Sequence, residues 1–275
     1  MALKVIIFGG GDLASGVALR LFRSGLQVII TELPQPVMVR RLVSFGEAMY
    51  RGEFTVEGVA SQRVEKLEKV QRVLDRQKIP VIHLPIEQLI PAIRLNNSVA
   101  VVDARMRKQP PEYDLSLAPF IVGLGPGFIA GVNCHAVIET QRGHLLGRVI
   151  WEGEPLGDTG IPEKVQQFAA ERVLRSPADG VLEAFVEIGD LVQPQQLVAR
   201  VNGEPVQAPF KGVLRGLAHA GLEVNKGMKI GDVDPRNDPR YCSLVSDKSL
   251  AIGGAVLEAL LSQSSLRPVL WDELY

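Results

Sequence analysis

Residues 4–16 read KVIIFGGGDLASG and join a strand pattern to a glycine-rich turn. The first five residues are apolar and rich in β-branched side chains, which is typical of a buried strand. Apolar residues then recur with a helical period from Val17 to Ser24, and a second β-rich run follows from Leu26 to Thr31. Strand, turn, helix and strand in this order predict a Rossmann-like βαβ unit at the start of the chain.

The glycines of this turn fit the dinucleotide fingerprint. In Gly9-x-Gly11-x-x-Ala14, the small residues allow a tight turn, close approach to a pyrophosphate, and close packing of helix on strand. Free amides at the start of the helix favour an anion. Glu32 follows the second strand at about the usual spacing of roughly 20 residues for a carboxylate that binds a ribose hydroxyl. The turn therefore predicts a nucleotide-bearing ligand; the alternative is that the glycines only permit a tight crossover.

Alternating strands and helices over roughly the first 125 residues predict a doubly wound parallel sheet. The apolar run 99–103 ends in Asp103, and FIVGLGPGF at 120–128 is a second glycine-rich exit from an apolar run. Ligands gather at the carboxyl ends of such strands, so we expect both on the same rim as the first turn. Asp103 either binds a ligand there or caps the next turn. The candidate binding residues are Gly9, Gly10, Gly11, Asp12, Leu13, Ala14, Glu32, Asp103, Gly123, Gly125 and Gly127.

Composition excludes several classes of function. The 275 residues carry a formal net charge of −1, which gives no electrostatic case for binding nucleic acid or a membrane surface. No apolar run approaches the roughly 18 residues that span a bilayer, and the chain begins directly with a core strand. The two cysteines form no CxxC, so we expect a cytoplasmic protein. No metal site is predicted, because Asp232, Asp234 and Asp238 lack the EF-hand spacing and fit turns instead.

An internal repeat lies in the second half of the chain. Ser176–Leu182 recurs as Ala208–Leu214, and each copy contains Pro-x-x-Gly-Val-Leu. The pattern resembles the biotinyl/lipoyl type of barrel-sandwich hybrid, a small β-rich module. Its carrier lysine would lie on the hairpin between the two halves, but no lysine occurs between Leu182 and Phe210. We therefore expect no lipoyl or biotinyl attachment.

The expected domain organisation follows the chain in order. Residues 1–150 form the Rossmann-like domain that binds a nucleotide or cofactor, and residues 151–175 form a linker and a helix. Residues 176–236 form the β module, and residues 237–275 form a C-terminal helix and tail. That helix is predicted over Ser249–Leu261, where small residues offer a face for close packing.

Several motifs together resemble one family. The segments GGGDLASG (9–16), GLGPGF (123–128), VIETQRGHLLGR (137–148), KIGDVDPR (229–236) and SDK (246–248) resemble the YqeB-like, selenium-dependent molybdenum hydroxylase accessory proteins. This family is distantly similar to the xanthine dehydrogenase accessory factors, which handle the molybdenum cofactor on a Rossmann domain. The resemblance implies a maturation role, the molybdenum cofactor or a dinucleotide as ligand, and a molybdenum hydroxylase apoenzyme as partner. The CxxC-like elements of some accessory factors have no match here.

Other functions stay open at this point. An NAD-dependent oxidoreductase would use Glu32 to prefer NAD over NADP, although no Tyr-x-x-x-Lys set accompanies it. A non-catalytic scaffold would use both domains to bind proteins. Cys134 is either structural or a soft thiolate that contacts molybdenum or selenium. The sequence assigns no catalytic residue, and it leaves open whether the protein is a homo-oligomer.

Overall fold

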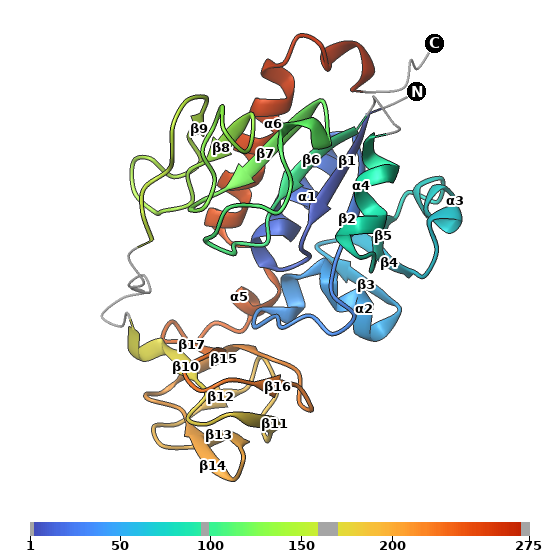
Figure 1. Cartoon of the computed structure of the whole chain (residues 1–275). Helices are drawn as coiled ribbons and strands as arrows, with labels where there is room; N and C mark the ends of the chain where they lie inside the picture. The colour runs from blue at the N-terminus through green and yellow to red at the C-terminus, as the bar shows by residue number, and fades with distance from the viewer. Residues whose placement is uncertain (1–2, 95–98, 159–169, 271–275) are drawn as a thin grey trace. The chain divides into compact units, whose positions relative to one another are not determined.

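The computed structural model describes residues 3–94, 99–158 and 170–270, which form two compact units (Figure 1). Unlike the domain ranges expected from the sequence, both units are assembled from separate segments of the chain. Unit 1 comprises Met1–Pro34, Phe45–Asp158 and Val245–Tyr275, and unit 2 comprises Gln35–Ser44 and Thr159–Leu244. Of the expected linker and helix at 151–175, residues 159–169 lie outside the described residues, and Val173–Arg175 form a strand where the helix was expected to end.

Unit 1 is built on a nine-stranded mixed sheet of order β3-β4-β5-β2-β1-β6-β7-β8-β9. Its strands are β1 (Lys4–Phe8), β2 (Gln27–Thr31), β3 (Glu53–Val56), β4 (Val59–Val64), β5 (Ile79–Ile82), β6 (Val99–Asp103), β7 (Phe120–Leu124), β8 (Ala136–Ile138) and β9 (Val149–Ile150). The pairs from β4 through to β8 are parallel, whereas β3–β4 and β8–β9 are antiparallel.

The expected fold class is therefore wrong for this unit, because the sheet is mixed and not a doubly wound parallel one. The cause is visible at the turn between β3 and β4. Glu57 and Gly58 both have positive φ, of 45° and 83°, as in the two-residue hairpins that match strand twist. So short a connection can join only antiparallel strands, since a parallel pair needs a crossover.

Two helices of unit 1 pack closely on each other. The α-helices of the described residues are α1 (Asp12–Arg23), α2 (Ala48–Arg51), α3 (Val70–Leu74), α4 (Ile86–Arg94), α5 (Arg240–Ser243) and α6 (Asp247–Ser262). Of these, α1 lies along α6. A Cβ built on Gly253 would lie 2.6 Å from the carbonyl oxygen of Gly16, so the two backbones nearly touch. The helix predicted over Ser249–Leu261 is confirmed as α6, and the Ser246 hydroxyl caps it by accepting from the Ser249 amide.

A hydrophobic core includes side chains from the sheet and from α3 and α4. It includes Phe8, Ile82, Val101, Ile121, Val137, Val73, Leu89 and Ile93. Tyr113 joins it, with its ring edge-on to Phe8 at 5.8 Å between centroids. These strands are almost entirely buried, which explains their continuous apolar sequence.

Unit 2 consists of two four-stranded sheets, of order β10-β17-β15-β12 and β14-β13-β11-β16, with antiparallel pairing throughout. Its strands are β10 (Val173–Arg175), β11 (Gly180–Ala184), β12 (Leu191–Val192), β13 (Leu197–Val201), β14 (Glu204–Gln207), β15 (Gly212–Leu217), β16 (Glu223–Val224) and β17 (Lys229–Asp234). The segment 35–44 belongs here: Arg41 Nε donates to the carbonyl of Leu217 at 2.7 Å.

The repeat predicted in unit 2 is reproduced in its pairing. Gly180 pairs with Val224 across β11 and β16, and the equivalent residues Gly212 and Val192 pair across β15 and β12. The expected biotinyl/lipoyl-type barrel-sandwich hybrid is nevertheless wrong as a fold class, because the strands divide into two four-stranded antiparallel sheets. One of these sheets recruits β10, which precedes the expected module at 176–236. The repeat specified local strand–turn–strand geometry and not the assembly of the sheets.

Candidate functional site

The strand register places the predicted residues along one edge of the nine-stranded sheet. Phe8, at the end of β1, is level with Thr31 and with Asp103, and Asp103 is level with Gly123. The carboxyl ends of β1, β2, β6 and β7 therefore share one rim, as expected for parallel neighbours. That these residues bind a ligand stays a prediction.

Gly10 is enclosed by other parts of unit 1. Its amide donates to Glu32 Oε2 at 2.6 Å, and its carbonyl accepts from the Gly46 amide at 2.9 Å and from the Ser15 hydroxyl at 3.2 Å. Ser15 Oγ in turn accepts from the Phe45 amide at 2.8 Å. A Cβ on Gly10 would lie 2.8 Å from Gly46 Cα. Sequence reasoning missed the contacts of Ser15 and Gly46 with Gly10, because the fingerprint carries no signal for residues outside the motif that pack against it.

Gly11 is open. It is the N-cap of α1 with φ of −71°, and no side chain within the described residues caps the helix there. A Cβ built on Gly11 meets no described atom within 4 Å. In the first turn that follows, Asp12 Oδ1 accepts from the Ser249 hydroxyl at 3.1 Å, and Ala14 is buried. The open part of the predicted site is therefore the end of α1, from Gly11 to Leu13.

Both carboxylate oxygens of Glu32 accept hydrogen bonds from backbone amides. Besides the bond from Gly10, Glu32 Oε1 accepts from the Leu33 amide at 2.7 Å. The ring of His83, which follows β5, lies 3.0 Å from the Glu32 carbonyl oxygen. Burial raises the pKa of the Glu32 carboxyl above its usual value, while the two amides and the His83 charge oppose that rise.

Asp103 is held by groups of its own neighbourhood. Arg105 donates to both of its oxygens, through Nε at 3.0 Å and Nη2 at 2.6 Å, and the Tyr113 hydroxyl donates at 2.9 Å. Asp103 also accepts from the Arg105 amide at 3.2 Å, which is the capping contact that was one of its two predicted roles. Burial opposes the charge of Arg105, yet hydrogen bonds to Asp103 and Glu112 raise its pKa overall.

The second glycine loop is shaped by internal packing. Phe128 covers Gly123, and a Cβ on Gly127 would lie 2.7 Å from the backbone of Gln109. Gly125 has φ of 69° and donates its amide to the carbonyl of Ile138 at 3.0 Å. Close approach is thus required at this loop, but the partner is the protein itself.

Both thiols of the chain are buried. Burial raises the pKa of Cys134 to about 12 and raises that of Cys242 above its usual value. His135 does not serve Cys134 as a base, because its Nδ1 accepts from the Ile121 amide at 3.0 Å. Neither thiol is placed as a soft ligand for molybdenum or selenium. Within 3–94, 99–158 and 170–270, no three His, Cys, Asp or Glu side chains gather to hold a metal ion.

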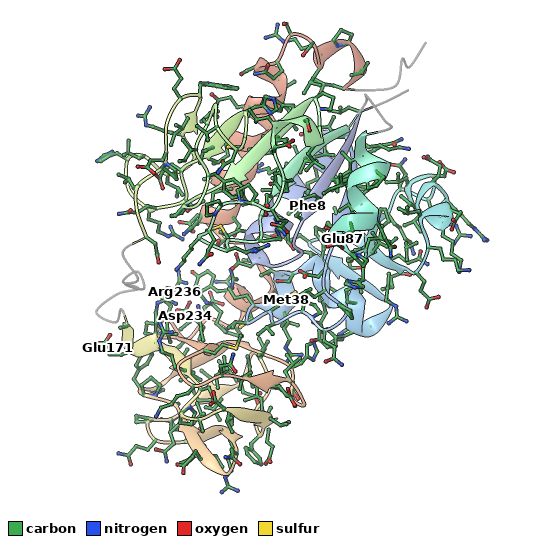
Figure 2. All side chains as sticks on the ribbon, in the orientation of Figure 1. Phe8, Met38, Glu87, Glu171, Asp234 and Arg236 are labelled. Atoms are coloured by element: carbon green, nitrogen blue, oxygen red, sulfur yellow. The ribbon has the colours of Figure 1, made fainter. Side chains whose placement is uncertain are left out.

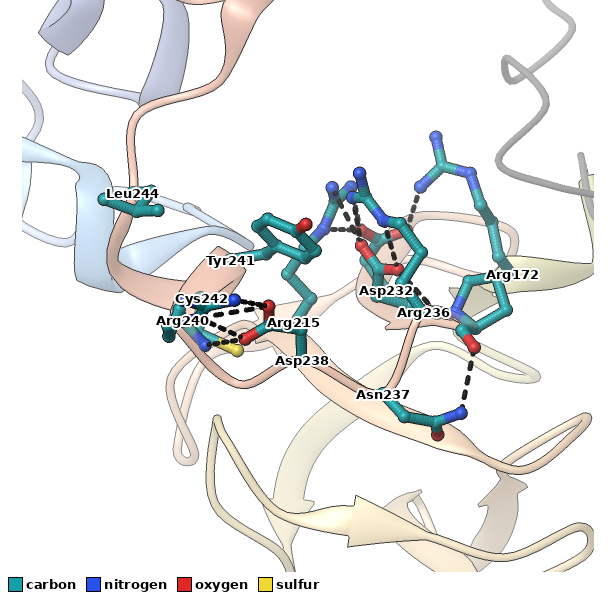
Figure 3. A network of polar contacts seen from close by, with 12 residues as sticks. Arg172, Arg215, Asp232, Arg236, Asn237, Asp238, Arg240, Tyr241, Cys242 and Leu244 are labelled. Atoms are coloured by element: carbon teal, nitrogen blue, oxygen red, sulfur yellow. Dashed lines mark hydrogen bonds and ion pairs between the residues drawn. The ribbon is translucent and has the colours of Figure 1, made fainter.

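Unit 2 contains a buried ion-pair network at β17 (Figures 2 and 3). Asp232 pairs with Arg172 and Arg215, and Asp234 pairs with Arg236 at 2.6 Å. Asp232 and Asp234 were predicted to form turns, but they are buried strand residues, because these arginines compensate their charge. The pairs of Asp232 with Arg172 and Arg215 are nearly fully buried, as in a structural core.

None of the described helices is long and apolar enough to cross a membrane. No protein-family model matches the chain. Similar solved structures include an aspartoacylase family protein from Mesorhizobium loti (13% identity, 85% of both chains, TM-score 0.27). Others are the ectoine utilization protein EutE from Ruegeria pomeroyi (10%, 84% of this chain and 86% of that one, 0.26) and a succinylglutamate desuccinylase from Silicibacter (14%, 84% of both, 0.24).

A curated relative is far more similar in sequence. The chain is 43% identical over 257 residues to the uncharacterized protein YqeB of Escherichia coli (strain K12), which covers 94% of this chain and 47% of YqeB. The chain thus spans about half the length of that relative. The similarity to YqeB extends over nearly the whole of this chain.

Proposed function

We propose that this protein is an accessory factor in the maturation of a selenium-dependent molybdenum hydroxylase. In this role it binds the phosphate end of a molybdopterin-type cofactor at Gly11 and the first turn of α1. Two observations support the proposal: the similarity to YqeB, together with the motifs shared with its accessory family, and the open end of α1. The open end of α1 is the main support for the proposal, because it is the part of the predicted rim that the protein leaves accessible.

The chemistry of this end suits a phosphate. The first amides of a helix have no partner within the helix, and the macrodipole places partial positive charge there. A glycine N-cap lets an anion approach those amides without meeting a side chain. Because Gly10 already donates to Glu32, the ligand is held by Gly11 and the residues after it, and not by the whole loop.

The residues present fit the phosphate end of such a cofactor and not its metal end. Both thiols are buried and so cannot reach molybdenum. The bound cofactor would supply the redox chemistry of the hydroxylase, whereas this chain binds and orients its phosphate. The proposed role is handling and transfer of the cofactor to the apoenzyme.

The test is a titration of the purified protein with molybdopterin cofactor, in its dinucleotide form, by calorimetry. We expect Gly11→Asp to abolish binding, since it places a carboxylate where the phosphate binds, while an Asp N-cap adds a few tenths of a kcal/mol to stability. Gly254→Asp is the matched control, because Gly254 is an exposed position of α6 with no described atom near its added Cβ. Equal affinity of the two variants would refute the site.

The maturation role is tested in cells. A strain that lacks this protein should lose hydroxylase activity, and the gene for Gly254→Asp should restore it while that for Gly11→Asp does not. Normal hydroxylase activity in the deletion strain would refute the role. An NAD-dependent oxidoreductase is the competing function, and a rise in melting temperature with NAD but not with the molybdenum cofactor would favour it.

A further inference from the structure

Two adjacent residues of the glycine loop differ in their surroundings. The Gly10 amide is bound to the carboxylate of Glu32 at 2.6 Å, while Gly11 faces open space among the described residues. A carboxylate is itself an anion, so the loop already holds one negative group next to the open position. The distance between neighbouring amides is a few ångströms, at which two like charges repel appreciably.

We infer that Glu32 is an internal competitor for the phosphate, so that the loop accepts a ligand anion tightly only when Glu32 is neutral or displaced. This inference rests on the proposed function, because it concerns regulation of the same site. It gives Glu32 a role opposite to that of the fingerprint acid, which would help to bind a ribose.

Among the charged groups near Glu32, the charge of His83 favours the ionised carboxylate. His83 follows β5, contacts the Glu32 backbone oxygen and is exposed. Asp103, at the end of β6, is committed to Arg105, and Glu47 pairs with Arg51. Asp12, at the start of α1, accepts from the Ser249 hydroxyl at 3.1 Å. Asp103 and Glu47 are each paired with an arginine, so the charge that opposes an incoming anion is that of ionised Glu32.

The competition predicts a direction for pH dependence. Burial raises the pKa of Glu32, so the side chain becomes neutral as pH falls through that raised value. A neutral Glu32 no longer repels the ligand, and anion binding strengthens toward acid. The ring of His83 lies beside the Glu32 backbone, so His83→Gln is needed to separate its contribution from that of Glu32.

The experiment uses inorganic sulfate and the whole 275-residue chain, because the charge of sulfate is constant between about pH 5 and pH 8. Binding is measured by calorimetry at fixed ionic strength. For the unmodified protein and for His83→Gln we expect affinity to weaken as pH rises over this range. For Glu32→Gln, which keeps an oxygen acceptor for the Gly10 amide, we expect about tenfold tighter binding at pH 8. For Glu32→Gln combined with His83→Gln we expect a flat profile. Glu68→Gln removes the same charge from an exposed position and should leave affinity within about twofold.

Weaker or unchanged sulfate binding by Glu32→Gln would overturn the competition, as would a flat profile of the unmodified protein. If all variants bind sulfate and the molybdenum cofactor alike, the competition is wrong and the proposed function stands. If neither the unmodified protein nor Glu32→Gln binds sulfate or the cofactor, both ideas fall. The pH profile of the unmodified protein keeps the test valid even if Glu32→Gln does not fold.

Discussion

Gly10 and Gly11 are neighbours in the chain but differ in what a side chain would meet. At Gly10 an added Cβ would lie 2.8 Å from Gly46 Cα, whereas at Gly11 it would meet no described atom within 4 Å. The fingerprint predicted that both residues lie at a tight turn. It could not predict which of them is filled, because Glu32 and Gly46 reach Gly10 from elsewhere in the chain.

This contrast gives a prediction for stability. Gly10→Ala should lower the free energy of unfolding by about 1–3 kcal/mol, since the backbone of Gly46 must move. Gly11→Ala should change it by less than about 0.5 kcal/mol, because its φ of −71° suits alanine and the space is open. Urea unfolding of the two variants measures both values. Equal loss in the two would mean that Gly46 does not cover Gly10.

The thiols give a second prediction at the residue scale. With a pKa of about 12 and no exposed surface, Cys134 should not react with a water-soluble thiol reagent in the native protein. Cys242, also buried, should behave in the same way. We expect no rapid labelling at neutral pH and labelling of both after unfolding in guanidinium. Fast labelling of Cys134 in the native state would restore it as a candidate ligand.

At the scale of elements, the glycines of α6 show what a helical repeat in the sequence can predict and what it cannot. The sequence predicted the helix, which is confirmed, and a small-residue face for close packing, of which Gly253 packs on Gly16 whereas Gly254 is exposed. The partner could not be predicted, because Gly16 lies in the helix that follows the fingerprint, far away in sequence. The antiparallel edges of the sheet were missed for a similar reason, because short apolar runs indicate strands but not their direction.

Two adjacent glycines of α6 test this packing. Gly253→Ala should destabilise the protein by about 1–3 kcal/mol, because the new Cβ meets the Gly16 carbonyl. Gly254→Ala should stabilise it by up to about 1 kcal/mol, since alanine is the better helix former and the position is open. Thermal unfolding of the pair gives the comparison. Similar melting temperatures would mean that α1 and α6 are not in close contact.

At the scale of the whole molecule, charge is distributed in a way that composition conceals. The net charge of −1 correctly indicated no excess of either sign, but it gave no hint that unit 2 buries carboxylates among arginines. A sequence of the type Asp-x-Asp-Pro is typical of turns, and only the assembled sheet shows that Arg172 and Arg215 lie beside it. Long-range ion pairs of this kind are not encoded in local spacing.

The network predicts how unit 2 responds to acid. Burial favours the neutral form of Asp234, but its bonds to Arg236 and the charge of Arg215 lower its pKa overall. A lowered pKa means that the stabilisation is complete above about pH 4 and is lost as pH falls through the folded-state value. Asp234→Asn should lower the free energy of unfolding by about 2 kcal/mol at neutral pH and remove this part of the acid dependence. Urea unfolding at several pH values measures both, and an unchanged acid profile would contradict the assignment.

The excursion of residues 35–44 into unit 2 has a consequence for the glycine loop. The chain leaves unit 1 shortly after Glu32 and returns at Phe45 and Gly46, so the two residues that hydrogen-bond to Gly10 flank one connecting segment. A single cleavage of the backbone within 35–44 would therefore weaken both contacts with Gly10. Limited proteolysis of this segment would then loosen the rim, although the cleavage site lies outside it.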